Sequence, residues 1–294
     1  MNRRNFLASS CAASLIPTTL GQEQNQKPLF QISLAQWSNH RMLQAGKFNN
    51  LAWPQYAKKN YDIDALEYVN QFFKDKAEDN AYLAELNQRV SDLGMNNVLI
   101  MIDGEGHIGA KSEKDRNTTV DNHKRWVTAA KTLGCHSIRV NAYGNGTPKE
   151  AAKQVTEGLH KLATFASEHD INILVENHGG NSSNGKWLAE VLTAVNLPNC
   201  GSLPDFGNFH EYDRYLGLRD LMPFAKGVSA KSHEFDEDGN EVRTDFAKAM
   251  SLVIAANYHG YVGIEYEGKK HSEDEGVKLT KALLQKVKKE HKQG

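Results

Sequence analysis

Four residues whose side chains can bind a metal ion or carry a proton recur at regular intervals in the second half of the sequence. They are Glu176, Asp205, His233 and Glu265, separated by 29, 28 and 32 residues. Three carboxylates and one imidazole suit a hard or borderline divalent cation such as Mn2+, Mg2+ or Co2+, whereas structural zinc favours cysteine. The pattern predicts a site for one divalent metal ion, for which zinc is the less suitable choice.

The spacing of these residues matches the length of one strand-helix unit, about 30 residues. Short apolar segments alternate with longer amphipathic stretches along the chain, and eight such pairs can be counted. The expected strands span residues 30–38, 63–70, 96–103, 136–144, 171–179, 201–208, 227–235 and 261–268. Several are continuously apolar, as strands buried on both faces are. The alternation predicts an α/β fold, a TIM (β/α)8 barrel in a single domain, with its active site at the C-terminal ends of the strands.

Helix signals separate these strands. In residues 147–170, Thr147 is expected to cap a helix and Pro148 to occupy its first turn, while Val155, Leu159 and Leu162 share one face. These features predict an outer barrel helix.

The first residues, MNRRNFLASSCAASLIPTTLGQ, resemble a twin-arginine export signal. Arg3 and Arg4 precede a short, weakly apolar stretch that is too short to span a bilayer. We expect residues 1–26 to form the signal and a polar linker, and residues 27–294 to form the barrel. A soluble periplasmic product is expected, in preference to a lipoprotein processed at Cys11.

The strings VENHGG, LPDFGNF, SAKSHEFD and GIEYEG, which carry the four residues, resemble the xylose isomerase-like, or sugar phosphate isomerase/epimerase, TIM-barrel family. The resemblance extends over the whole chain after the leader. It implies that Glu176, Asp205, His233 and Glu265 bind one divalent metal ion. It also implies that Glu176 and Glu265 exchange protons with a sugar substrate as an acid/base pair.

The chemistry of the residues leads to the same roles. Removing a proton from carbon next to a carbonyl leaves negative charge on oxygen, which a metal ion can stabilise. Two carboxylates on opposite faces of the substrate can then deprotonate and reprotonate it. Epimerisation, ketose-aldose isomerisation and β-elimination all pass through such an enediolate. These residues are compatible with an isomerase or epimerase and equally with a lyase or hydratase that acts on 3-keto sugars or glycosides.

Other polar residues near the expected strand ends are candidates for lining a sugar pocket, although each could equally serve loop structure. The candidates are Trp37, Glu67, Asn70, Asp103, His107, Asn141, Tyr143, His178 and Lys231. Trp37 could offer a stacking surface, and His178 could contact the substrate or orient a ligand. Lys231 could polarise a substrate oxygen or form a salt bridge to a ligand carboxylate.

Several other functions fit the sequence less well. The formal net charge of -1 gives no basic surface for nucleic acid, which argues against the related abasic-site endonucleases. Gly104, Gly106 and Gly109 match a dinucleotide motif, but a polar loop follows them and Glu105 would repel a pyrophosphate.

The expected partner is a small, non-phosphorylated sugar, because the strand-seven and strand-eight ends carry no Gly-rich phosphate loop or arginine clamp. No membrane contact is expected after signal removal, and homo-oligomerisation stays open. Cys135 and Cys200 show no metal-binding spacing and are expected in the core. A non-catalytic sugar-binding barrel is the alternative from another functional class.

Overall fold

The computed structural model describes residues 28–291. The predicted export signal, with Arg3, Arg4 and Cys11, lies outside the described residues. Within them, eight parallel strands form one sheet, in the order β6-β5-β4-β3-β2-β1-β8-β7. The strands are β1 Gln31–Ala35, β2 Ala65–Val69, β3 Asn96–Met101, β4 Ser137–Asn141, β5 Asn172–Glu176, β6 Cys200–Leu203, β7 Val228–Ser232 and β8 Tyr261–Tyr266. The predicted (β/α)8 barrel is confirmed.

The barrel closes between β6 and β7 through single bridges instead of a full ladder. Pro204 ends β6 because its nitrogen has no hydrogen to donate. Its carbonyl still accepts a bond from the backbone N–H of Ser229 at 2.9 Å, and Phe206 N–H donates to Ser229 O at 3.0 Å. This closure pairs Asp205 with Ser229 in a parallel bridge. Asp205 and Ser229 are therefore held side by side at the mouth of the barrel.

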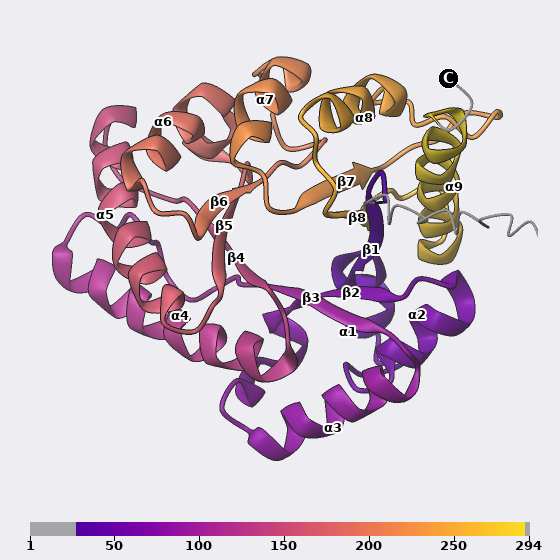
Figure 1. Cartoon of the computed structure of the whole chain (residues 1–294), viewed down its shortest axis with the longest axis horizontal. Coiled ribbons are helices and arrows are strands. Elements are labelled where there is room, and N and C mark those ends of the chain that lie inside the picture. The colour runs from indigo at the N-terminus through magenta and orange to yellow at the C-terminus, as the bar shows by residue number, and fades with distance from the viewer. Residues whose placement is uncertain (1–27, 292–294) are drawn as a thin grey trace, which may run out of the picture.

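Helices surround the strands (Figure 1). They are α1 His40–Gln44, α2 Trp53–Tyr61, α3 Asn80–Asp92, α4 Glu113–Leu133, α5 Pro148–Ser167, α6 Gly185–Val195, α7 Arg214–Leu221, α8 Phe246–Ala255 and α9 Glu273–His291. The predicted cap of α5 is confirmed: Thr147 and Glu150 form a reciprocal capping box, and Pro148 lies in the first turn.

Alternation along the strands divides the apolar residues into two layers. Leu66 and Tyr68 of β2 face the helices in the larger core, whereas Ala65 and Val69 belong to a smaller cluster with residues of the neighbouring strands. This smaller cluster packs inside the barrel, because side chains of a strand point alternately to opposite faces. Buried Glu67 lies between Ala65 and Val69 on the same inward face, so the barrel interior contains acidic as well as apolar side chains.

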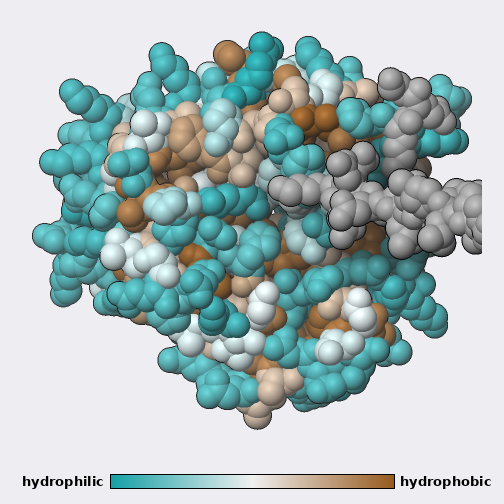
Figure 2. All heavy atoms as spheres, viewed as in Figure 1, coloured by the Kyte–Doolittle hydropathy of each residue, from teal (hydrophilic) through white to brown (hydrophobic). Residues whose placement is uncertain are grey.

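The face of the molecule in Figure 2 is mostly hydrophilic, with scattered apolar residues. Among residues 28–291, no helix is long and apolar enough to cross a membrane. Cys135 and Cys200 are buried and, within the described chain, neither forms a disulfide.

Candidate active site and metal centre

Three of the four predicted ligands meet at the C-terminal mouth of the barrel. Glu176 ends β5, Glu265 lies in β8, and Asp205 follows β6. One carboxylate oxygen from each lies within 4.8 Å of the other two, and all three side chains are buried. Oxygen ligands at such separations suit a divalent cation. The triad could therefore hold a metal ion.

Backbone hydrogen bonds fix the position of Asp205. Its Oδ1 accepts the N–H groups of Gly207 at 2.7 Å and Asn208 at 2.8 Å. Asn177, just beyond β5, donates from Nδ2 to Asp205 O at 3.0 Å and accepts from Asp205 N–H at 2.8 Å. The loop carrying Asp205 is thus tied to the end of the strand that carries Glu176, and Oδ2 of Asp205 is turned toward the triad.

Two residues of β7 complete the surroundings of Asp205 and Glu265. The hydroxyl oxygen of Ser229 lies 2.8 Å from Asp205 Oδ2 and 2.7 Å from Glu265 Oε2. Lys231 is in register with Glu265, and its Nζ lies 3.3 Å from Glu265 Oε1 and 3.7 Å from Asp205 Oδ2. Of the two roles considered for Lys231, the structure shows the salt bridge to a predicted ligand carboxylate.

Arg139 of β4 gives the centre a second buried cation. Its Nε lies 2.9 Å from Glu176 Oε2, and its Nη1 donates to Asp103 Oδ1 at 2.8 Å. Asn141 also donates to Asp103 Oδ1, at 2.7 Å. Asp103, Arg139 and Glu176 therefore form a charge network across β3, β4 and β5, in which Asn141 takes part.

Burial and the two cations have opposing effects on the carboxylates. Burial raises the pKa of Glu176 and of Asp205, and the charges of Arg139 and Lys231 oppose this only in part. Burial would also raise the pKa of Glu265, but the Lys231 ammonium and the Ser229 hydroxyl outweigh it, so this pKa is lowered. The two glutamates proposed as the proton carriers therefore lie in different electrostatic environments.

His233 lies apart from the three carboxylates. It follows the end of β7, its side chain is 23% exposed, and its Nε2 is 3.7 Å from Glu267 Oε2. Among the described residues, the group of potential ligands contains the three carboxylates without His233. The structure thus does not bring the predicted imidazole ligand into the group. Ser229, bridged to Asp205, and Lys231, in register with Glu265, are the β7 residues beside these carboxylates, whereas His233 lies beyond the end of the strand.

An aromatic and imidazole cluster lies at the mouth beside Glu176. The Tyr143 hydroxyl donates to His178 O at 2.9 Å and lies 3.2 Å from His178 Nδ1. The ring of exposed His107 lies 5.5 Å from that of Tyr143, centre to centre. Burial lowers the pKa of His178, so its neutral imidazole can offer both a donor and an acceptor.

Glu67 and Asn70, two of the candidates for lining a sugar pocket, are buried and already have protein partners. Asn70 is buried, and its amide group pairs with the backbone N–H and carbonyl of Asp103. Glu67 accepts a hydrogen bond from Ser33, and a Cβ atom placed on Gly263 would lie 2.5 Å from its carboxylate. The contact of Glu67 joins β1 and β2 inside the barrel, and the contacts of Asn70 join the segments that follow β2 and β3.

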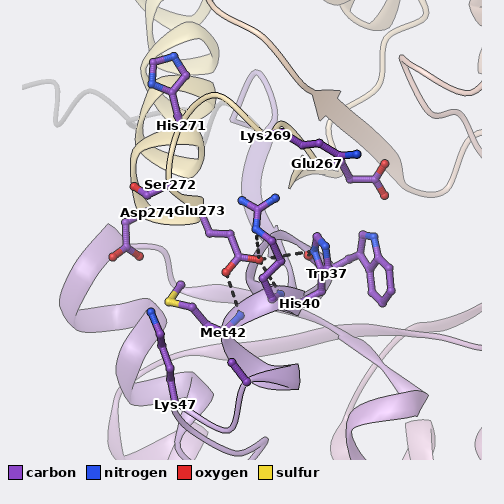
Figure 3. Close-up of a pocket in the computed structure, with 12 residues that line it drawn as sticks. Trp37, His40, Met42, Lys47, Glu267, Lys269, His271, Ser272, Glu273 and Asp274 are labelled. Atoms are coloured by element: carbon purple, nitrogen blue, oxygen red, sulfur yellow. Dashed lines mark hydrogen bonds and ion pairs between the residues drawn. The ribbon is translucent and has the colours of Figure 1, made fainter.

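Trp37 lines a pocket of about 860 Å3 at the rim, between the turn after β1 and the loop after β8 (Figure 3). Its ring stacks on His40 with centres 4.6 Å apart. Buried Glu273 accepts the backbone N–H groups of Arg41 and Met42 in the same pocket. Glu267 connects this pocket with the carboxylate centre, because Lys231 Nζ lies 3.3 Å from its Oε1. His40 therefore covers one face of the Trp37 ring, for which a stacking role was predicted.

The residues of the triad fit a divalent cation in number and chemistry. Glu176 Oε2 is a buried oxygen that makes no hydrogen bond of good geometry within the described chain, although it lies beside Arg139. A buried carboxylate oxygen without a well-aligned hydrogen bond can coordinate a metal cation. Glu176, Asp205 and Glu265 are the residues that would hold the ion.

Arg139, Ser229, Asn208 and Glu267 contribute to the site but were not among the sequence candidates. Asn208 donates from Nδ2 to Glu176 Oε1 at 3.1 Å. The signal that could have found three of them is alternation: Arg139 precedes Asn141 by two residues, Ser229 precedes Lys231 by two, and Glu267 follows Glu265 by two. The rejected glycine motif has a structural role instead, since buried Glu105 within it binds Arg125 and Trp126.

Comparison with known proteins identifies the family. A family model described as xylose isomerase-like TIM barrel matches residues 55–288. No curated protein sequence matches the chain.

Three solved structures illustrate the similarity in fold. The IolI protein with a bound zinc atom has a TM-score of 0.71 and 15% identity, over 89% of this chain and 99% of that one. A D-psicose 3-epimerase in the presence of D-fructose has a TM-score of 0.70 and 14% identity, over 88% and 99%. The 3-keto-D-glucoside 4-epimerase YcjR from E. coli has a TM-score of 0.68 and 17% identity, over 87% and 99%. With the match of the family model, these findings establish that the chain belongs to the xylose isomerase-like TIM barrels.

Proposed function

We propose that this chain is a divalent-metal-dependent isomerase or epimerase acting on a non-phosphorylated sugar or keto-sugar. The observation that carries the proposal is the convergence of Glu176, Asp205 and Glu265 at the barrel mouth, with ligand oxygens within 4.8 Å of one another. The names of the similar structures support it, since two of them are epimerases of a ketose and of a 3-keto-glucoside and the third has a bound zinc atom.

When bound, a divalent ion would stabilise negative charge that develops on a substrate oxygen. Glu176, Asp205 and Glu265 would hold it, and Mn2+, Mg2+ and Co2+ are the ions that this oxygen-rich set favours. Two backbone N–H groups bind Oδ1 of Asp205, which fixes the side chain and leaves Oδ2 facing the other two carboxylates. Its role is to position the ion.

Glu176 and Glu265 are the proposed proton carriers. Arg139 and Asn208 orient Glu176, while Ser229 and Lys231 orient Glu265. One glutamate would remove the proton from the carbon next to the substrate carbonyl, and the other would return a proton from the opposite side or at the neighbouring carbon. Both side chains are buried, so a substrate carbon placed between them would be shielded from water.

Polar groups at the mouth would bind the sugar hydroxyls. His178 and Tyr143 lie on the Glu176 side, with His107 at the outer edge. Trp37 and the rim pocket offer space beyond the catalytic centre for the rest of the substrate. Hydroxyl groups both donate and accept hydrogen bonds and pair well with such side chains.

Proton exchange tests the reaction directly. The metal-loaded protein is incubated with ketoses, aldoses and 3-keto-glucosides in deuterated water, and NMR locates any deuterium that enters the sugar. We expect exchange at the carbon next to the carbonyl, with a new epimer or isomer as product, and loss of exchange after chelation. An unsaturated product would indicate the lyase alternative instead. Sugar binding that survives chelation, without exchange in any candidate, would indicate a non-catalytic binding barrel.

We also propose that residues 1–26 direct export by the twin-arginine route and that the barrel works in the periplasm. The support is the RRNFL string followed by a short, weakly apolar stretch. This route carries folded proteins. A barrel that has bound its metal ion before export is compatible with it.

A further inference from the structure

A lysine ammonium group lies among the carboxylates that would bind the metal ion. Nζ of Lys231 is 3.3 Å from Glu265 Oε1, 3.7 Å from Asp205 Oδ2 and 3.3 Å from Glu267 Oε1. The side chain is 2% exposed. Two of these three partners are in the metal-binding triad, so the ammonium and a divalent ion would draw on the same negative charge.

The fold makes room for this lysine. A Cβ atom on Gly207 would lie 2.9 Å from Cδ and 3.1 Å from Cγ of Lys231, so the glycine leaves space for the stem of the side chain. Gly207 also donates its N–H to Asp205 Oδ1. The loop that positions Asp205 thus accommodates Lys231 as well, and the ammonium is held in its place by packing.

Two buried cations already lie beside the carboxylates of the centre before any ion binds. Arg139 and Lys231 place two positive charges beside Glu176, Asp205 and Glu265, and all five side chains are at most a few per cent exposed. Ser229, a neutral residue, is the β7 side chain that touches Asp205 and Glu265. A centre with its own cations needs a metal ion less for its stability than one of carboxylates alone.

We propose that Lys231 is a built-in cation that competes with the divalent metal ion for Asp205 and Glu265. When a metal ion takes these two carboxylates, the ammonium keeps Glu267 as its partner, on the side of the rim pocket. The proposal rests on the metal centre put forward above. It predicts a protein that folds without metal and binds a divalent ion more weakly than the same centre would without the lysine.

Metal affinity and stability test the competition without any substrate. Mn2+ binding is measured by isothermal titration calorimetry for wild type, Lys231→Met, Lys231→Gln and the surface control Lys153→Met, whose residue is exposed on α5. Thermal unfolding is followed for each with EDTA and with Mn2+. The glutamine variant retains a polar side chain and is purified with Mn2+, in case the methionine variant does not fold.

Both Lys231 variants are expected to bind Mn2+ roughly 10- to 100-fold more tightly than wild type, because the positive charge that competes for Asp205 and Glu265 is removed. In EDTA, the unfolding temperatures of the Lys231 variants should be lower than that of wild type, and Mn2+ should restore them. Mn2+ should change the unfolding temperatures of wild type and Lys153→Met only a little. A second comparison isolates Glu267: Glu267→Gln should weaken Mn2+ binding in wild type and do so much less in the Lys231→Met background.

The outcomes separate the competition from the metal centre itself. Equal or weaker Mn2+ binding by folded Lys231 variants would overturn the role of the lysine and leave the metal centre standing. Absence of binding in every variant, including wild type, would overturn the metal centre and the competition together.

Discussion

Nε of Arg139 lies 2.9 Å from Oε2 of Glu176, and both side chains are almost fully buried. The same guanidinium binds Asp103, so one cation on β4 neutralises acidic groups contributed by the neighbouring strands β3 and β5. The Arg139 charge outweighs burial and lowers the pKa of Asp103 to about 2. Arg139 thus links the proposed proton carrier Glu176 to the wall of the barrel.

Replacement of Arg139 by Met is expected to lower the free energy of unfolding by about 3 kcal/mol or more, because it leaves buried Glu176 and partly buried Asp103 without their cation. Urea unfolding measures this. Arg89→Met is the control, since Arg89 pairs with Glu85 on the exposed face of α3 and its loss should cost at most about 1 kcal/mol. Equal costs for the two variants would contradict a structural role for the Arg139 network.

The order of strands and helices could be predicted because alternation and caps are local signals. The Thr147 cap of α5 and the convergence of Glu176, Asp205 and Glu265 follow from the sequence and from barrel geometry. In a parallel barrel, residues at successive strand ends reach the same level. That rule needs no knowledge of packing.

The contribution of β7 could not be predicted in the same way. Ser229, Lys231 and His233 alternate on one face, and the sequence does not say which of them lies level with Glu265. The register of β7 against β8 decides it, since Lys231 pairs with Glu265 and His233 lies beyond the strand. The contacts of Asn70 could not be predicted for another reason: its side-chain amide binds the backbone of Asp103, which is 33 residues away in the sequence.

Metal binding should depend on Asp205 and much less on His233. Asp205→Ala removes a triad ligand and is expected to abolish stoichiometric binding, whereas His233→Ala should leave it unchanged, because the imidazole lies outside the carboxylate group. Elemental analysis and Mn2+ titration of both variants measure this. Loss of the ion from His233→Ala would instead restore the histidine to the ligand set that the sequence predicts.

Glu176→Gln and Glu265→Gln should each lower turnover by about 10^2- to 10^4-fold at saturating metal, the range for loss of general acid-base catalysis. The amide retains an oxygen ligand but cannot accept the proton. Steady-state kinetics and deuterium exchange are measured with the bound metal checked in each variant. Near-normal turnover by either variant with metal bound would exclude the two-base mechanism and direct attention to His178 or Lys231.

Export should require the arginine pair. Cells that express Arg3→Lys/Arg4→Lys are expected to retain the precursor in the cytoplasm, because the pair is the distinguishing feature of a twin-arginine signal. Fractionation followed by immunoblotting measures the distribution. The control is Lys153→Met, which leaves the signal intact; export of the double variant at the same level as this control would rule out the twin-arginine route.

Glu67 makes the stability of the barrel depend on pH. Burial raises its pKa to about 8, and the hydrogen bond from Ser33 opposes this only in part. In the unfolded chain the carboxyl loses its proton near its ordinary pKa of 4.5. Between these two values folding requires the uptake of a proton, so the contribution of Glu67 to stability is fully present below pH 4.5. It is lost as the pH rises to about 8, at up to about 1.4 kcal/mol per pH unit.

Glu67→Gln should remove this loss, because the amide resembles the protonated acid and does not titrate. The measurement is the free energy of unfolding by urea at several values between pH 5 and pH 8, and the quantity compared is its decline over that interval. Over this interval the free energy of unfolding of wild type should fall by about 2 kcal/mol more than that of the variant, allowing for relaxation around the buried group. Glu85→Gln, on the exposed face of α3, should decline like wild type. If the free energy of unfolding of Glu67→Gln fell as steeply with pH as that of wild type and Glu85→Gln, Glu67 would already be ionised inside the folded barrel. Arg139 would then be near enough to compensate for its charge.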